Sequence, residues 1–532
     1  MKVHDGFNRA PPRTGHGLSP VGGCATVGRV STEDARPLAR TAYGMVEGRT
    51  EQRVAVFRGI PYAAPPVGPA AFAAPAPPAS WDGVRDAGAF GPTAPKVPYP
   101  EPFAALLPDP DVPGDDCLNL NVWTPDPAPG ARLPVMVWIH GGALTRGSSA
   151  CPVYDGAAFA RDGVVLVSVN YRLGVLGYGL FPDAPANRGL LDQIAALAWV
   201  RDNISAFGGD PERVTVFGES AGAISIGSLL AAPRAAGLFS RAVLQSGAPE
   251  VLPRDRVRTV VRRMASLLKV PATARAFAAV DPTVLLAAQA AVLRRSGPLL
   301  GGPAFGLVTD PGTLPGDPLD ALVAGRASAA VPLLLGWTTE EYRLWLAPTG
   351  MQRHLDRLGP LAVALARRRS GKDRAAVRAL RAGLPAAGAG DVAGHLLTDL
   401  RLRDPLRRLA AAPGRRAPAH LYEFGWRSGI PGLGACHALE LGFVFDTLAV
   451  PESSWLAGPE APQALADEMH AAWVAFATHG DPGWDADDPR SRKALHAPYD
   501  GAGRPKEFGG PARAADLGAE RTGRTTPTRV LP

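Results

Sequence analysis

The chain has 532 residues, of which 46% are hydrophobic and 20% are charged, and these proportions are typical of a globular protein. Its formal net charge of +7 is carried almost entirely by arginine, and no aromatic residues interleave with the basic clusters, so we expect no nucleic-acid partner. No apolar run approaches the ~20 residues that span a bilayer, and the four cysteines are too few for a disulfide framework and contain no Cys-x-x-Cys pair. These features predict no membrane partner, no metal site and no cofactor.

The two ends of the chain differ in composition from the rest. Residues 1–40 are polar and contain Pro and Gly, which predicts a loose leader, and residues 512–532 have the composition of a polar tail. The leader contains no apolar segment of the kind found in a signal peptide. We therefore expect a cytoplasmic protein, with secretion as the alternative.

Strands alternate with helices along the central part of the chain. Residues 133–139 and 164–169 are continuous apolar runs bounded by turn residues, as in strands buried on both faces of a parallel sheet. Residues 189–207 have apolar residues at helical spacing. Further strands are predicted at 214–217, 242–245 and 331–335. This alternation predicts an α/β fold with a central, mostly parallel sheet flanked by helices.

Two stretches interrupt the alternation. Residues 254–300 and 350–412 are rich in Ala, Leu and Arg with helical periodicity, and no linker-like composition separates either of them from its neighbours. We interpret them as helical cap insertions within one domain that spans residues 41–511. The oligomeric state is not encoded in any pattern that we recognise, and a monomer is compatible with the composition.

The most specific chemical pattern is Gly-x-Ser-x-Gly at residues 218–222, after a short strand and before a helix of small and apolar residues. This order is typical of a nucleophile elbow, in which a sharp strand-to-helix turn exposes the serine hydroxyl. Because the chain contains 61 glycines, the pattern alone is weakly specific. It makes Ser220 the candidate nucleophile, and further parts of the site must support it.

A Gly-rich loop follows the strand at residues 133–139. Its sequence is His140-Gly141-Gly142-Ala143-Leu144, and small residues there let backbone amides approach a substrate oxygen. Gly142 and Ala143, together with Ala221 after the serine, are therefore the candidate oxyanion donors. In enzymes with a nucleophile elbow, the acid and then the histidine follow the serine along the chain. His140 precedes the serine, which favours a role in anchoring the loop.

The acid and the base should follow the serine in the chain. The predicted strand 331–335 leads to Glu340 and Glu341, and either glutamate fits the position. Seven histidines follow: His354, His395, His420, His437, His470, His479 and His496. Small residues precede His437 and an apolar stretch follows it, which favours a packed loop, whereas His479 follows a predicted helix and is open to a capping role.

Several further segments resemble one family. They are Phe57-Arg58-Gly59-Ile60-Pro61-Tyr62-Ala63, Asp115-Asp116-Cys117-Leu118-Asn119-Leu120-Asn121-Val122, Asn170-Tyr171-Arg172-Leu173-Gly174, Gly189-Leu190-Leu191-Asp192-Gln193 and Phe207-Gly208-Gly209-Asp210-Pro211. Together with the serine motif they resemble the type-B carboxylesterases, the cholinesterase-like branch of the α/β-hydrolases. The resemblance runs from about Gly44 to Phe508.

The resemblance implies an α/β-hydrolase fold and a catalytic triad of Ser220, Glu341 and His437. It also implies oxyanion donors at Gly142, Ala143 and Ala221, and a buried supporting acid at Glu219 beside the nucleophile. The implied activity is hydrolysis of small carboxylic esters through an acyl-enzyme. Amidase, carbamate hydrolase and polyester hydrolase activities remain alternatives, as does a non-catalytic adhesion protein of the same fold, whose members lack part of the triad.

The chain departs from the family pattern at three places. Cys117 lacks the partner cysteine that the family often has after Phe-Gly-Pro, and a free thiol there suits a reducing compartment. The loop from Val97 to Gly114 has no Trp of the kind that binds quaternary ammonium in the cholinesterases, so choline esters are not expected as substrates. Tyr342 follows the acid where Gly is common. Cys436, beside His437, is either a thiol that faces the site or a small core residue.

Overall fold

The computed structural model describes residues 36–294, 303–486 and 506–508. The predicted tail at 512–532 and most of the predicted leader lie outside these residues. The last residues of the predicted leader form strand β1 (Leu38–Arg40), which pairs antiparallel with β2 (Met45–Glu47), and β2 pairs with β5 (Val84–Asp86) in a small sheet.

The main sheet has ten strands in the order β13-β12-β11-β10-β9-β7-β8-β6-β4-β3. Their bounds are β3 Arg49–Glu51, β4 Val54–Pro61, β6 Asn119–Thr124, β7 Leu133–Ile139, β8 Val165–Val169, β9 Gly209–Glu219, β10 Arg241–Gln245, β11 Leu333–Thr338, β12 Ala419–Phe424 and β13 Lys506–Phe508. Every neighbouring pair from β8 to β13 is parallel, whereas β6, β4 and β3 pair antiparallel at the other end. The predicted α/β fold with a mostly parallel sheet is confirmed.

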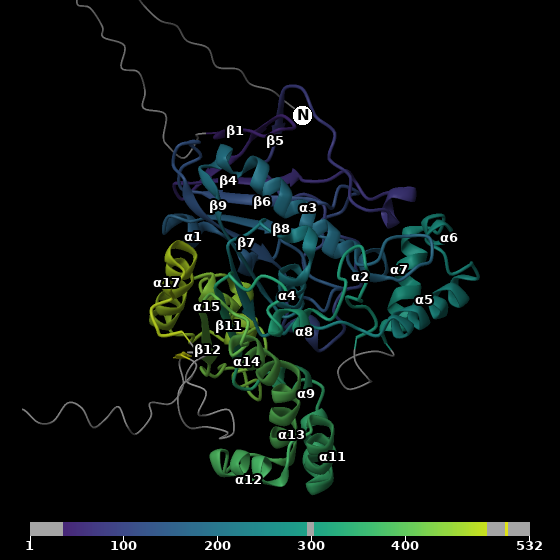
Figure 1. Cartoon of the computed structure of the whole chain (residues 1–532), viewed down its shortest axis with the longest axis vertical. Coiled ribbons are helices and arrows are strands. Elements are labelled where there is room, and N and C mark those ends of the chain that lie inside the picture. The colour runs from purple at the N-terminus through teal and green to yellow at the C-terminus, as the bar shows by residue number, and fades with distance from the viewer. Residues whose placement is uncertain (1–35, 295–302, 487–505, 509–532) are drawn as a thin grey trace, which may run out of the picture.

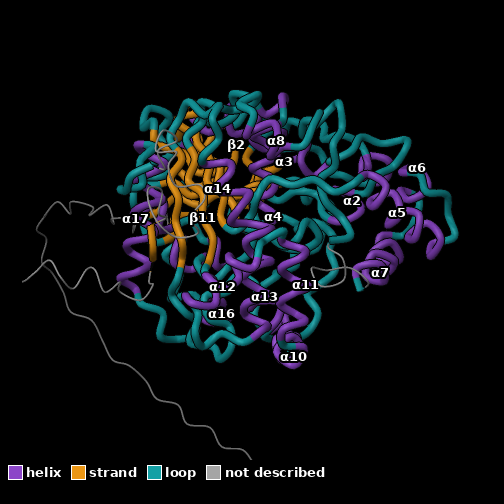
Figure 2. Tube along the Cα trace, turned by 60° about the horizontal axis from the view of Figure 1, so that its bottom comes forward, coloured by secondary structure: helices purple, strands orange, loops and turns teal. Residues whose placement is uncertain are grey.

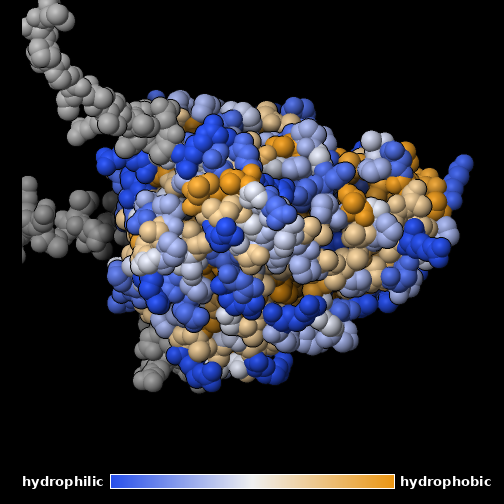
Figure 3. All heavy atoms as spheres, turned by 90° about the horizontal axis from the view of Figure 1, so that it is seen from above, coloured by the Kyte–Doolittle hydropathy of each residue, from blue (hydrophilic) through white to orange (hydrophobic). Residues whose placement is uncertain are grey.

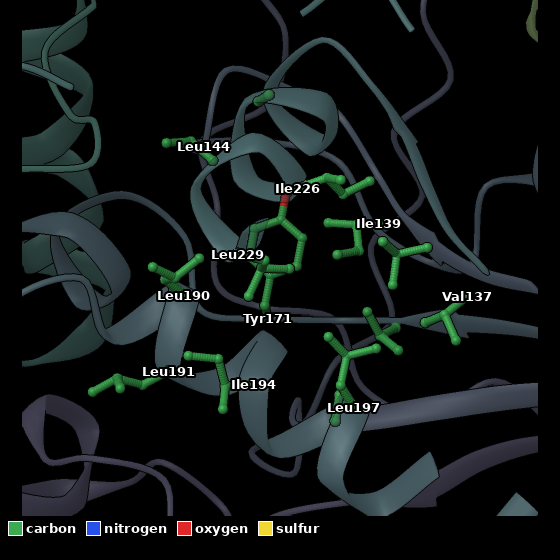
Figure 4. Packing of buried hydrophobic residues seen from close by; sticks show 14 of the residues in the cluster. Val137, Ile139, Leu144, Tyr171, Leu190, Leu191, Ile194, Leu197, Ile226 and Leu229 are labelled. Atoms are coloured by element: carbon green, nitrogen blue, oxygen red, sulfur yellow. The ribbon is translucent and has the colours of Figure 1, made fainter. Parts of the chain in front are cut away.

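Successive side chains of a strand point to opposite faces of the sheet, so the apolar strands present apolar side chains on both faces. Helices cover both of them. In β7, Val135, Val137 and Ile139 pack on the face covered by α3 (Arg188–Asn203) and α4 (Ala221–Ala231). Figure 4 shows part of this packing, in which residues of α3 and α4 surround Val137 and Ile139. Met136 and Trp138 face the other layer, which contains α1 (Ala157–Arg161) and α17 (Gln463–His479). Figure 2 shows α17 and the α3–α4 layer on opposite sides of the strands.

Two groups of helices project from the sheet (Figure 1). The first contains α5 (Arg254–Leu268), α6 (Ala274–Ala278) and α7 (Pro282–Leu293), inside the predicted range 254–300. The second lies inside the predicted range 350–412. It consists of α10 (Met351–Leu358), α11 (Pro360–Ser370), α12 (Arg374–Gly383), α13 (Ala389–Thr398), the π-helical turn η8 (Asp399–Arg403) and α14 (Asp404–Ala410). Its last helix, α14, does not project but packs against β11 and β12. We call this second group the helical insertion.

The surface is mixed in polarity. Figure 3 shows one face on which hydrophilic residues predominate and hydrophobic residues gather in small patches. Large apolar side chains are exposed on the projecting helices, among them Leu267 on α5 and Leu361 and Leu365 on α11. None of the helices in the described part of the chain combines the length and the apolar character needed to cross a membrane.

The contact between β7 and the start of α4 leaves no room for a side chain at Gly222. A β-carbon at Gly222 would clash with the backbone carbonyl of Ile139. We therefore expect Gly222→Ala to destabilise the protein by about 3 kcal/mol or more, because neither the strand nor the helix can retreat without disturbing the core. Thermal or urea unfolding monitored by circular dichroism measures this loss.

Gly383, the last residue of α12, is the matched control. Nothing lies within 4 Å of a β-carbon built at this position, and replacing a helical glycine by alanine stabilises by roughly 0.5–1 kcal/mol. Gly383→Ala should leave stability unchanged or raise it slightly. Equal stabilities for Gly222→Ala and Gly383→Ala would contradict the close packing of α4 against β7.

Candidate active site

Ser220 occupies a strained turn between β9 and α4. Its backbone angles are φ 56° and ψ −120°, a combination that residues other than glycine rarely adopt. The turn is fixed by a hydrogen bond of 2.9 Å from the Ser220 amide to the carbonyl of Gln245 on the neighbouring strand β10. Because α4 begins at Ala221, the positive end of the helix dipole lies directly beside Ser220. This geometry is that of a nucleophile elbow.

The Gly-rich loop after β7 is folded into a tight turn. Gly142 and Ala143 both have positive φ angles, of 106° and 55°. The carbonyl of Gly142 accepts hydrogen bonds from the amides of Thr145 and Arg146. Within the described part of the chain, the amides of Gly142 and Ala143 themselves donate to no protein acceptor, so both remain available to a ligand.

His140 lies at the base of the same loop. Burial lowers the pKa of its imidazole to about 3, so the ring is neutral and its Nδ1 donates to the carbonyl of Gly141 at 2.8 Å. The ring stacks on Tyr171 with 4.4 Å between centroids, and the Tyr171 hydroxyl donates to the His140 carbonyl. His140 therefore anchors the loop.

The two glutamates after β11 have different partners. Glu341 Oε1 accepts a hydrogen bond of 2.8 Å from the amide of Thr338, and its Oε2 lies 2.5 Å from Nδ1 of His437. Glu340 instead pairs with Arg343 and accepts a hydrogen bond from the amide of Ala435. Of the two candidates that the sequence left open, only Glu341 contacts the histidine.

His437 is buried between two carboxylates. Opposite Glu341, its Nε2 lies 3.0 Å from Oε1 of Glu219, the residue before Ser220. Within the described residues no hydrogen bond joins His437 to Ser220. The structure thus brings Glu341, His437 and Glu219 together next to the elbow, with Nε2 turned toward Glu219. His479, the other histidine considered, is exposed at the C-terminal end of α17.

The charges of this cluster depend on one another. Burial opposes protonation of His437, but the carboxylates of Glu219 and Glu341 outweigh it and raise the pKa of the imidazole well above its ordinary value. For Glu341 the same pairing outweighs burial and lowers the pKa of the carboxyl group. Burial raises the pKa of Glu219, although His437 acts in the opposite direction. These shifts favour an imidazolium at His437.

Sequence reasoning missed three residues that surround this cluster. Glu440 is fully buried, and burial together with the charges of Glu219 and Glu341 raises its pKa to about 8. Ser246, at the end of β10, donates to Glu440 at 3.4 Å. Trp345 lies against the imidazole of His437 with 4.7 Å between ring centroids. His437, Glu440 and Glu341 lie in turns rather than helices, so no periodic pattern in the sequence could have revealed Glu440 or Trp345.

Cys436 is fully buried in the core, and burial raises the pKa of its thiol far above the ordinary value. This location favours the core interpretation over a thiol that faces the site. Cys117 and Cys151 are also buried, and neither forms a disulfide. In the described ranges, no three His, Cys, Asp or Glu side chains are grouped in a way that could bind a metal ion.

Comparison with known proteins identifies the family. The model of the carboxylesterase family matches residues 35–497 of this chain. The para-nitrobenzyl esterase of Bacillus subtilis (strain 168) is 38% identical over 463 residues, which cover 84% of this chain and 91% of that protein. The phenmedipham hydrolase of Pseudarthrobacter oxydans is 36% identical over 473 residues, which cover 85% of this chain and 94% of that protein.

Solved structures agree with the sequence matches. A carboxylesterase of Geobacillus stearothermophilus superposes with a TM-score of 0.74 at 36% identity, covering 86% of this chain and 95% of that one. A para-nitrobenzyl esterase structure superposes with the same TM-score and identity over 85% of this chain and 93% of the other. The fold is therefore that of the α/β-hydrolases. The chain belongs to the carboxylesterase family, and it is a carboxylic ester hydrolase.

Proposed function

We propose that this protein is a serine carboxylesterase in which Ser220, His437 and Glu341 form the catalytic triad. The observation that carries the proposal is the pairing of Glu341 with Nδ1 of His437 at 2.5 Å, which leaves the other ring nitrogen facing Glu219, the residue before Ser220. A carboxylate on Nδ1 fixes the tautomer in which Nε2 can accept a proton.

In the acylation step, neutral His437 takes the proton of the Ser220 hydroxyl as the serine oxygen attacks the ester carbonyl. Nε2 must turn from Glu219 toward Ser220 for this transfer, and such contacts are often absent before substrate binds. The imidazolium that forms is stabilised by Glu341 on one side and by Glu219, 3.0 Å from Nε2, on the other. His437 then gives its proton to the leaving alcohol.

The amides of Gly142, Ala143 and Ala221 are proposed to bind the oxyanion of the tetrahedral intermediate. The first two have no acceptor within the described part of the chain, and the third begins α4, where the helix dipole favours negative charge. Each such donor typically contributes ~3–4 kcal/mol to transition-state stabilisation. Water then attacks the acyl-enzyme by the same steps and releases the acid.

The proposed substrates are small esters of alcohols without a quaternary ammonium group. In the loop that lacks Trp, the aromatic ring of Tyr99 is covered by the protein's own Arg146, whose guanidinium lies 5.2 Å from the ring centroid. That ring is therefore not free to bind a cationic alcohol group. Amides, carbamates and polyesters use the same chemistry and remain second candidates.

We further propose that the protein acts without a metal or cofactor, binds neither nucleic acid nor a membrane, and works in the cytoplasm. The exclusion of nucleic acid rests on the lack of aromatic residues among the basic clusters. The cytoplasmic location rests on the buried, unpaired Cys117, Cys151 and Cys436. Secretion is the alternative. A monomer is the simplest assembly, and size-exclusion chromatography with light scattering determines it.

Replacing Ser220 with alanine tests the proposal directly. We expect Ser220→Ala to lower kcat for a short-chain p-nitrophenyl ester by about 10³-fold or more, because no other group can form the acyl-enzyme. The variant should also lose covalent labelling by a fluorophosphonate. Stopped-flow or plate absorbance at several ester concentrations measures kcat and KM.

Ser228→Ala is the matched control, because Ser228 lies on the same helix α4, is buried, and donates only to the carbonyl of Ile224. Its activity should stay within about twofold of wild type, as expected for a residue remote from the chemistry. Activity of Ser220→Ala near the wild-type level would refute the triad, and would also make an amidase or polyester hydrolase based on Ser220 untenable.

The carboxylate of Glu219 should also set the pH dependence. Because Glu219 and Glu341 raise the pKa of His437, and only the neutral imidazole can accept the serine proton, kcat/KM should rise with pH to a midpoint above that of an ordinary histidine. Glu219→Gln removes one negative charge from the imidazolium and should move this acid limb to lower pH by about one unit or more. A pH–rate profile from about pH 5 to 10 measures the shift.

Glu212→Gln removes an exposed carboxylate from the same strand β9 and should leave the midpoint in place. An acid limb that stays fixed in Glu219→Gln, or that moves to higher pH, would contradict the stabilisation of imidazolium by Glu219.

A further inference from the structure

A second polar cluster lies behind the Glu341–His437 pair, where the helical insertion meets the catalytic loops. Its centre is Asp391 in the first turn of α13. One carboxylate oxygen of Asp391, Oδ1, accepts three hydrogen bonds, from Tyr342, Arg343 and Gln352, at 2.8, 2.7 and 2.8 Å. Gln352 belongs to the insertion itself, whereas Tyr342 and Arg343 directly follow Glu341.

Arg343 carries this connection to the loop that bears His437. Its Nε donates to Glu340 at 2.6 Å, and its Nη1 donates to the carbonyl of Gly432 at 3.1 Å. Glu340 in turn accepts from the amide of Ala435 at 3.0 Å, and the Glu340 amide donates to the Ala435 carbonyl. Ala435 lies two residues before His437. These hydrogen bonds thus join α13 to two backbone segments: the turn that carries Glu341 and the loop that precedes His437.

The insertion contacts the same turn at a second point. Arg403, in the π-helical turn η8, donates from Nη2 to the carbonyl of Thr339 at 2.7 Å. The turn that carries Glu341 is therefore bonded to the insertion both before and after the glutamate. These two bonds add to the one that the amide of Thr339 donates to the carbonyl of Phe424, at the end of β12, at 2.9 Å.

The cluster is largely withdrawn from solvent. The side chains of Glu340, Arg343 and Asp391 are 8%, 14% and 13% exposed. Arg427, the remaining charged member, lies 2.5 Å from Glu340 and is mostly exposed. At such low exposure, charge-assisted hydrogen bonds are stronger and more directional than on the surface. Two carboxylates and two guanidinium groups also balance in charge.

Tyr342 joins the turn after Glu341 to α13. The family commonly has glycine after the catalytic acid, and a glycine has no hydroxyl to donate to Asp391. Here the ring of Tyr342 packs against His395 of α13 with 5.1 Å between centroids, and a β-carbon at Gly394 would clash with it. The residue that the sequence marked as a departure is thus the one that joins the acid to the insertion.

We propose that Asp391 and Arg343 are positioning residues through which the helical insertion fixes the distance between Glu341 and His437. The proposal rests on the proposed triad. Loss of the cluster leaves the reacting groups in place but loosens the contact between acid and base. The turnover of bound ester then falls while binding of the ester is little changed.

A double-mutant cycle tests this coupling in the full-length protein. Asp391→Asn and Arg343→Gln should each lower kcat about tenfold with KM within about twofold, and the double variant should also lose about tenfold rather than the ~100-fold of independent sites. Each variant should also shift the acid limb of kcat/KM to lower pH, because a loosened Glu341 contact lowers the pKa of His437. A purely structural role predicts no such shift.

Gln352→Ala is the matched control, since it removes a hydrogen bond to the same Asp391 oxygen without touching a catalytic loop. Asp373→Ala removes the N-cap of α12 and tests whether weakening the insertion elsewhere has the same effect. Both controls should keep kcat within about twofold of wild type. Tyr342→Phe, which removes only a hydroxyl, should lower kcat about threefold. This variant replaces Asp391→Asn in the test if Asp391→Asn fails to fold.

Three results would overturn the proposal. They are unchanged kcat in Asp391→Asn and Arg343→Gln despite a lower Tm, losses that multiply in the double variant, or losses of the same size in the two controls. The proposed function is tested separately, by the activity of Ser220→Ala. An active Ser220→Ala variant would remove the triad itself, whereas inactive Ser220→Ala with unchanged Asp391→Asn would remove only the positioning role.

Discussion

The site depends on one buried contact, in which a single imidazole lies between two carboxylates. Removing three ionisable groups from water is costly, and only short contacts with well-placed partners offset that cost. His437 meets this condition through Glu341 at 2.5 Å and Glu219 at 3.0 Å. The cluster therefore tolerates little movement of any member, and the elements that carry these residues must be fixed to a fraction of an ångström. Much of the surrounding structure serves this requirement.

The parallel sheet supplies the first part of that precision. Strands β7, β9, β10 and β11 are neighbours and parallel, so their carboxyl ends meet at one edge. The Gly-rich loop follows the end of β7, Ser220 follows Glu219 at the end of β9, and Ser246 and Glu341 come after β10 and β11. The hydrogen bond from the Ser220 amide to Gln245 ties two of the ends together. Residues more than a hundred positions apart in the chain are adjacent because their strands are.

This dependence on strand ends explains how much the sequence could predict. Strand 133–139 was predicted with the bounds of β7, and the elbow motif made Ser220 the candidate nucleophile, because both rest on local patterns. The choice between Glu340 and Glu341 needed the family resemblance, since two adjacent carboxylates differ only in which way each side chain turns. Glu440, Ser246 and Trp345 were missed because their contacts cross from one strand end or loop to another. The direction of Nε2 toward Glu219 depends on charge and burial together, which no local pattern encodes.

The sheet alone does not fix the last residues of the site, because Glu341 and His437 both lie beyond strand ends on loops. A loop has the freedom to move by more than the Glu341–His437 contact permits. In this chain the helical insertion bonds to the turn before Glu341 through Arg403 and after it through Asp391. In the proposed positioning role, the insertion adds charged hydrogen bonds from outside the sheet to the backbone bonds that Thr339 makes with Phe424 of β12 and that His437 makes with Glu341. A substitution in the insertion can then alter the alignment of Glu341 and His437 without contacting either residue. Turnover then depends on helices that lie outside the sheet, whereas binding of the ester is little changed.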